Sequence, residues 1–187
     1  AGLKKALEDE AAARRFRVMG SGVREASFED LPFEEQVRTM QSTDLLVAVH
    51  GAEITNVIFM RPRSALVEVM PFAYTADVFF LLAQKVEVYH TFVVADPDPT
   101  RVAECLKKWS DGDTAGPAKF MVEFERLRVQ FDERQGEWKH TLSLNDRKGV
   151  VDYAKMVRPC LRAQMLSVDV MRVAQLGFGM LANSRQC

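Results

Sequence analysis

Two short apolar runs constrain the fold of this chain more than any other feature. They extend from Asp44 to Val49 and over residues 65–69, and both are rich in valine and leucine. Short continuous runs of this kind are typical of strands that are buried on both faces, as in a parallel sheet. A predicted helix over residues 53–60 joins them, so we expect a strand–helix–strand unit.

The same alternation continues on both sides of this unit. Residues 3–15 predict a helix and residues 16–19 a strand, and a further helix follows Pro32. After the unit, residues 75–85 predict a helix and residues 86–89 a third strand. Strands that alternate with short helices predict an α/β fold with a Rossmann-like, doubly wound parallel sheet.

The chain changes character at Asp96-Pro97-Asp98-Pro99, where two prolines mark a break. We therefore expect an α/β domain over residues 1–97 and a mostly helical extension over residues 98–187. Apolar side chains recur at helical spacing within the extension, at Phe120, Phe124, Leu127 and Phe131. This stripe is either a face packed on the sheet domain or a helix that binds a partner.

Charge and composition argue against several classes of protein. The formal net charge is −1, whereas a nucleic-acid-binding protein needs a basic patch or stripe. No apolar run approaches the roughly 18 residues of a membrane span. The cysteines form no C-x-x-C pair, so neither a thiolate zinc site nor a thioredoxin-like motif is expected. The chain starts without methionine in a helix-forming stretch, and we expect it to be a fragment.

The corner His50-Gly51-Ala52 is the candidate ligand site. It follows a buried strand, and open parallel sheets bind ligands beyond the carboxyl ends of their strands. Gly51 lets a ligand approach the backbone closely, and the N-terminus of the next helix suits an anion such as phosphate. Thr55 and Asn56 add a hydroxyl and an amide, and Glu68 ends the next strand, where a carboxylate can accept from ribose hydroxyls. A plain turn, with His50 capping a carbonyl, explains the same residues.

Several further motifs surround this corner. In chain order they are Phe28-Glu29-Asp30-Leu31, Phe33-Glu34-Glu35-Gln36-Val37, Ser42-Thr43-Asp44, Val49-His50-Gly51-Ala52, Thr55-Asn56, Phe59-Met60-Arg61-Pro62, Val67-Glu68-Val69 and Pro71. In their order and spacing, residues 28–71 resemble the catalytic domain of glycosyltransferase family 61. That family includes plant xylosyl- and arabinosyltransferases and animal protein O-linked N-acetylglucosaminyltransferases. The resemblance fades after about Tyr89.

The resemblance implies the C-terminal half of a GT-B enzyme, with residues 1–97 binding a nucleotide sugar. It further implies a UDP-sugar donor, a glycan or protein hydroxyl as acceptor, and transfer with inversion. Donor contacts would come from His50, Gly51, Ala52, Thr55 and Asn56, with His50 as the candidate catalytic residue and Glu68 near the nucleoside. Such enzymes generally bind the diphosphate without a metal, so no cofactor is expected. The implied location is the lumen of the Golgi or endoplasmic reticulum.

Two departures from the family pattern bear on activity. Family members usually have glycine or alanine where this chain has Glu53, and a carboxylate there either repels a diphosphate or faces away in the first helical turn. Pro32 replaces a common serine cap. A complete upstream Rossmann half is also absent from the sequence. The chain alone is therefore expected to bind a donor even if it transfers no sugar.

Other functions remain open from the sequence. Asp96 and Asp98 form a D-x-D after an apolar stretch, which can hold a divalent cation in a metal-dependent transferase, although the flanking prolines favour a linker. His50 and Glu53 have the spacing of a metal pair on a helix but lack a third ligand. His90 and His140 have no partner in sequence. A non-catalytic α/β scaffold with a partner-binding helical tail is the remaining alternative.

Overall fold

The computed structural model describes residues 2–14, 22–29, 31–72, 78–96, 98, 100, 101, 104 and 166–184. The chain divides into two compact units. The first comprises residues 1–70, 76–94 and 168–187, and the second comprises residues 71–75 and 95–167. The expected strand at residues 16–19 and the stripe from Phe120 to Phe131 lie outside the described residues.

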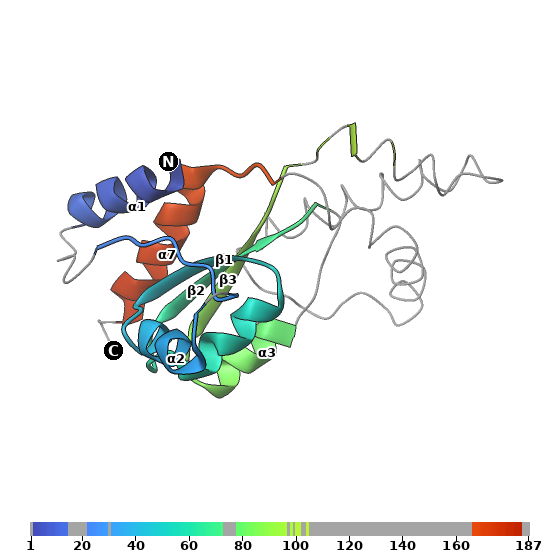
Figure 1. Cartoon of the computed structure of the whole chain (residues 1–187). Coiled ribbons are helices and arrows are strands. Elements are labelled where there is room, and N and C mark those ends of the chain that lie inside the picture. Colours follow the sequence, from blue (N-terminus) through green and yellow to red (C-terminus); the bar gives the residue numbers. More distant parts are fainter. Residues whose placement is uncertain are drawn as a thin grey trace, which may run out of the picture. The chain divides into compact units, whose positions relative to one another are not determined.

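A three-stranded parallel sheet forms the centre of the first unit (Figure 1). Its strands are β1 (Leu45–Val49), β2 (Ala65–Met70) and β3 (Tyr89–Val94), in the order β1-β2-β3. β2 is buried along its whole length because it pairs with a strand on each side. The predicted α/β class and parallel sheet are thus confirmed.

Helices cover both faces of this sheet. One face carries α2 (Phe33–Gln41), the 3-10 helix η1 (Ala52–Phe59) and α3 (Val78–Lys85), and the other carries α1 (Gly2–Ala13) and α7 (Val170–Ser184) (Figure 1). Both crossover connections therefore run over the same face, and the two ends of the chain supply the cover for the opposite face. None of the helices in the described ranges is long and apolar enough to cross a membrane.

Two apolar cores follow from the alternation of side chains along the strands. The core under α2, η1 and α3 consists of Met40, Ile54, Val57, Met60, Leu66, Phe79, Ala83 and Val88. The core under α1 and α7 consists of Ala6, Leu7, Ala11, Ala65, Val67, Val93, Val173, Ala174, Phe178 and Leu181. Neighbouring residues of β2, Ala65 and Leu66, thus belong to opposite cores.

The third strand begins at Tyr89, where the sequence predicted that it would end. Glu87 has a φ of 58°, which turns the chain sharply after α3. The turn is closed by the Val88 backbone N–H, which donates to the Ala83 carbonyl at 2.9 Å. Val86 accordingly packs against the core beside α3 instead of opening the strand.

The C-terminal helix differs from the expected domain division. The sequence placed it in a helical extension, but α7 contacts all three strands of the sheet. The reason is that Ala65, Val67 and Val93 form an apolar face that α7 completes. The helix approaches β1 closely at Gly177, where a Cβ atom would lie 2.7 Å from the Leu45 Cδ2 atom.

Val173→Asp tests this role of α7. Val173 is fully buried against Val67 and Val93, and an unpaired carboxylate buried there should lower the free energy of unfolding by about 3–5 kcal/mol. Gln175→Asp, at an exposed position of the same helix, is the matched control and should have little effect. Urea unfolding followed by circular dichroism measures both. Equal stability of the two variants would show that α7 does not belong to the core.

Candidate functional site

The corner after β1 has the predicted strand–turn–helix geometry. The His50 backbone N–H donates to the Val69 carbonyl at 2.8 Å, which ties the turn to the carboxyl end of β2. Gly51 is extended, with a φ of −179°. The helix that follows is a 3-10 helix of 8 residues, which is long for this type. No side chain in the described part of the chain caps its first N–H groups.

A buried carboxylate joins two histidines beneath α3. The Glu68 side chain is 0% exposed, and each of its oxygens is paired with an imidazole. Oε1 pairs with Nδ1 of His50, and Oε2 pairs with Nε2 of His90 at 2.7 Å. The side chains of His50 and His90 are 8% and 4% exposed. The three residues therefore form one enclosed polar line within a largely apolar layer.

Strand register explains why these three side chains meet. Glu68 on β2 is paired with Phe92 on β3, so His90, two residues before Phe92, lies on the same face of the sheet. Ala48 on β1 is paired with Glu68, and His50, two residues further along, also lies on that face. The line thus runs diagonally across the sheet from the carboxyl end of β1 towards the start of β3.

Two consecutive aromatic residues of α3 cover the histidines. The Phe79 ring lies 5.2 Å from the His50 ring, and the Phe80 ring lies 5.8 Å from the His90 ring, both measured between centroids. These contacts restrict the orientation of both imidazoles. They also keep water away from the carboxylate between them.

Opposing effects act on the charge of Glu68. Burial by itself would raise the pKa of the carboxyl, because it disfavours the ionised form. The hydrogen bonds from His50 and His90, and the positive charge that either imidazole carries when it is protonated, act in the opposite direction and outweigh burial. The pKa of Glu68 is consequently lowered from its ordinary value of 4.5. The site holds an ionised carboxylate at neutral pH.

This arrangement favours one form of the His50 ring. When Nδ1 carries the proton that it shares with a carboxylate, the neutral imidazole has its lone pair on Nε2. A carboxylate that orients a histidine in this way is the device by which a triad prepares a general base. The geometry therefore suits His50 for accepting a proton or a hydrogen bond from a ligand hydroxyl at Nε2.

The Asn56 amide faces α2. Its Nδ2 atom donates to Gln36 Oε1 at 3.1 Å. Gln36 Nε2 in turn donates to the carbonyls of Phe28 at 3.0 Å and Leu31 at 2.8 Å. Asn56 thus helps to fasten the segment before α2, while Thr55 is exposed on η1. The donor contacts predicted for both residues stay predictions.

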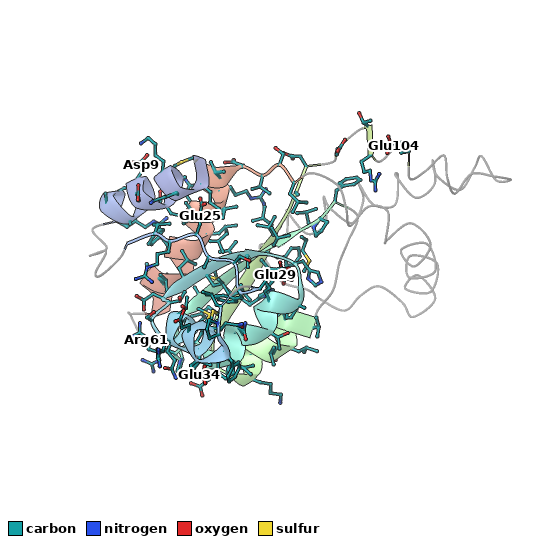
Figure 2. All side chains as sticks on the ribbon, viewed as in Figure 1. Asp9, Glu25, Glu29, Glu34, Arg61 and Glu104 are labelled. Atoms are coloured by element: carbon teal, nitrogen blue, oxygen red, sulfur yellow. The ribbon has the colours of Figure 1, made fainter. Side chains whose placement is uncertain are left out.

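Arg61, which belongs to the family-like motif series, lies far along the sheet from His50. Its Nη2 atom donates to Asp44 Oδ1 at 2.6 Å. Asp44 and Arg61 precede β1 and β2, so their ion pair lies at the amino ends of these strands, whereas His50 lies at the carboxyl end. Figure 2 shows Arg61 at the outer margin of the unit. Its charge does not serve the His50 corner.

Asp98 acts as a cap at the candidate D-x-D site. Its Oδ1 atom accepts hydrogen bonds from the backbone N–H groups of Thr100 and Arg101, both at 3.1 Å. Asp96 forms a backbone bridge with Ser167. Within the described ranges, no group of three or more His, Cys, Asp and Glu side chains is arranged to hold a metal ion. These contacts agree with the turn-forming interpretation of the motif.

His90 is the site residue that sequence reasoning missed. Its partner was not visible because the third strand was expected to end at Tyr89. Once β3 is known to start there, the period of two along a strand places His90 and Phe92 on one face. The missing signal was therefore the boundary of the strand. His140 lies outside the described residues.

The comparisons with known proteins connect this site to a family. Residues 5–67 match the family model described as Glycosyltransferase 61. No curated protein and no solved structure matches the chain. The match includes the His50 corner and begins within α1, well before the first motif at Phe28. It ends one residue before Glu68, so the two residues that complete the buried line with His50, Glu68 and His90, follow it.

Glu68→Gln tests the charged state of the buried line. The Gln side-chain oxygen can accept a hydrogen bond from one imidazole, but its NH₂ group faces the N–H of the other, so two donors oppose each other. The free energy of unfolding of the variant should therefore be lower by about 2–3 kcal/mol at neutral pH. A lowered pKa in the folded state gives stability that is present above the ordinary value of 4.5 and is lost as the pH falls through the folded value. The difference in free energy of unfolding between wild type and Glu68→Gln should therefore become smaller at acidic pH.

Urea unfolding above and below pH 4.5 measures this difference. Glu53→Gln, which neutralises an exposed carboxylate on η1, is the control and should change the free energy of unfolding far less than Glu68→Gln does. A constant difference between wild type and Glu68→Gln at all pH values would contradict an ionised Glu68.

Proposed function

We propose that the chain is the donor-binding half of a family 61 glycosyltransferase, because residues 5–67 match the model of that family. The family match supports the transferase class. We propose further that the fold is the C-terminal half of a GT-B architecture, that the donor is a UDP-sugar, and that a glycan or protein hydroxyl accepts the sugar with inversion. The observation that carries the proposal is the matched His50 corner at the carboxyl end of a parallel sheet.

The donor diphosphate is proposed to bind at Gly51 and the start of η1. A helix N-terminus offers N–H groups and a positive dipole end to an anion. Gly51 supports this position because neither backbone nor packing requires a glycine. Its φ of −179° is open to any residue, and an added Cβ would meet Val49 O at an ordinary 3.7 Å. The absent side chain leaves space for a ligand at the backbone.

His50 is proposed as the catalytic residue of this half-site. Inverting transfer needs a base that removes the proton of the acceptor hydroxyl. Pairing of Nδ1 with Glu68 leaves the lone pair of the neutral ring on Nε2, as a base requires. Because Glu68 is fully enclosed and both its oxygens pair with imidazoles, we propose that it orients His50 and does not bind ribose hydroxyls.

Glu53 is proposed to weaken donor binding. It is exposed in the first turn of η1, where the helix end attracts negative charge. There it competes with the diphosphate. Ala52 and Thr55 complete the proposed donor corner. We propose binding without a metal, and a location in the Golgi or endoplasmic reticulum lumen, both on the strength of the family.

Gly51→Ala tests the donor corner. The variant should fold with unchanged or slightly greater stability, by about 0.5 kcal/mol, because the backbone accommodates alanine. Its affinity for UDP should fall roughly tenfold, since the methyl group takes up the space of the ligand. Gly179→Ala on α7 is the matched control, because a Cβ there comes no nearer than 4.0 Å to Arg14. Isothermal titration with UDP, repeated with EDTA, measures the affinities. Wild type without UDP binding, or equal affinities, would refute the proposal.

Glu53→Ala tests whether the charge of Glu53 weakens binding of the diphosphate. Removal of one exposed charge near the diphosphate should tighten UDP binding by roughly threefold at low salt. The gain should diminish as the salt concentration rises, because salt screens exposed charges. Glu34→Ala, an exposed carboxylate on α2, is the control. An unchanged or weaker affinity of Glu53→Ala would place the diphosphate elsewhere.

A further inference from the structure

His90 lies outside the motifs of this chain that resemble the family and outside the matched segment, yet it makes a buried hydrogen bond within the site. It is the second residue of β3, and its side chain is 4% exposed. Its strand partner is Leu66, which belongs to the apolar core under α3. An apolar side chain at position 90 would therefore suit the surrounding packing. The histidine is explained by what its Nε2 atom reaches, which is Glu68 Oε2 at 2.7 Å.

One hydrogen bond does not fix a carboxylate. The terminal torsion of a glutamate is broad, so a carboxylate held at one oxygen can turn about its last bond. A donor on each oxygen defines the plane of the group. Glu68 has such a pair, from His50 on one oxygen and from His90 on the other. The His90 ring is itself held in place by the edge-to-face contact with Phe80.

We propose that His90 is a positioning residue that acts on His50 through Glu68. It donates from Nε2 to Oε2 and thereby keeps Oε1 directed at Nδ1 of His50. His50 is then held as the Nδ1–H tautomer, with its lone pair on Nε2. The importance of that tautomer for sugar transfer rests on the proposed function, but the effect of His90 on His50 does not.

Without the His90 donor, one oxygen of a buried carboxylate loses its partner. The group then turns to share its remaining partner or takes up a proton, because an unpaired buried charge is unfavourable. Either change removes the fixed acceptor for Nδ1–H of His50. The His50 ring would then populate both neutral tautomers. His90 thus influences the ring of His50, which follows a different strand, through the carboxylate that lies between them.

Nitrogen NMR of the histidine rings in the full chain tests the proposal. The chain has three histidines, and single substitutions assign their signals. Two-bond proton–nitrogen spectra identify which ring nitrogen carries the proton. We expect wild-type His50 as the Nδ1–H tautomer and His90 as the Nε2–H tautomer. A wild-type His90 with its proton on Nδ1 overturns the proposal without any variant.

Two variants then separate positioning from packing. His90→Phe keeps a ring against Phe80 but removes the donor, and it should shift His50 to a mixture of tautomers. His90→Gln supplies an amide N–H in place of Nε2–H and should restore the wild-type His50 signals. A folded His90→Phe protein with an unchanged His50 tautomer overturns the proposal, as does a His90→Gln protein that resembles His90→Phe.

UDP titration of the same proteins distinguishes this proposal from the proposed function. If Nε2 of His50 accepts a hydrogen bond from a hydroxyl of UDP, His90→Phe should weaken UDP binding by up to about tenfold, the cost of one misplaced hydrogen bond. A shifted tautomer with wild-type UDP affinity would support the role of His90 and refute the donor contact of His50. UDP binding that depends on Gly51, together with an unchanged His50 tautomer in His90→Phe, would support the proposed donor site and refute the role of His90.

Discussion

The ionised carboxylate of Glu68 is the constraint on which the rest of the site depends. It is fully buried in the central strand, and a charge in that position is unstable unless it is paired and hydrogen-bonded. The sheet meets this requirement with one imidazole from each neighbouring edge, His50 and His90. The presence of histidine at both positions is therefore explained by the hydrogen bonds that a buried carboxylate requires.

The two faces of the sheet differ in composition: one is apolar, and the other also contains the buried polar line of His50, Glu68 and His90. The face under α1 and α7 is covered by small and branched apolar side chains, including Ala65, Val67 and Val173, with no charge among its buried members in the described part of the chain. The opposite face combines an apolar core with the polar line under α3. Burial of apolar side chains under α1 and α7 stabilises the sheet. The face under α3 can therefore contain a buried carboxylate, which two histidines hold in a fixed orientation. The C-terminal helix, distant in sequence, thus supports the candidate site from behind.

Sequence reasoning predicted the parts of this fold that depend on local pattern. β1, β2 and α2 follow from continuous apolar runs and from Pro32, and the His50 corner follows from its position after β1. The start of β3 could not be predicted from local pattern, because it depends on the left-handed backbone conformation of Glu87. Glutamate rarely adopts this conformation, so the sequence gives no sign of it. The packing of α7 did not follow either, since it requires contacts with strands far away in the chain. The pairing of His90 with Glu68 required both the strand boundary and the register.

The residues that orient the His50 ring come from other strands. The matched segment ends at Val67, so it contains the His50 corner but neither Glu68 nor His90. An imidazole at the end of a strand can be donor, acceptor or base, and its own sequence neighbours do not decide among these. The role of the ring depends on the acceptor that faces Nδ1. Here that acceptor is Glu68 on β2, and His90 on β3 makes a hydrogen bond with the same carboxylate. The motif at one strand end therefore places the histidine, whereas the register of the two following strands determines which groups face its ring.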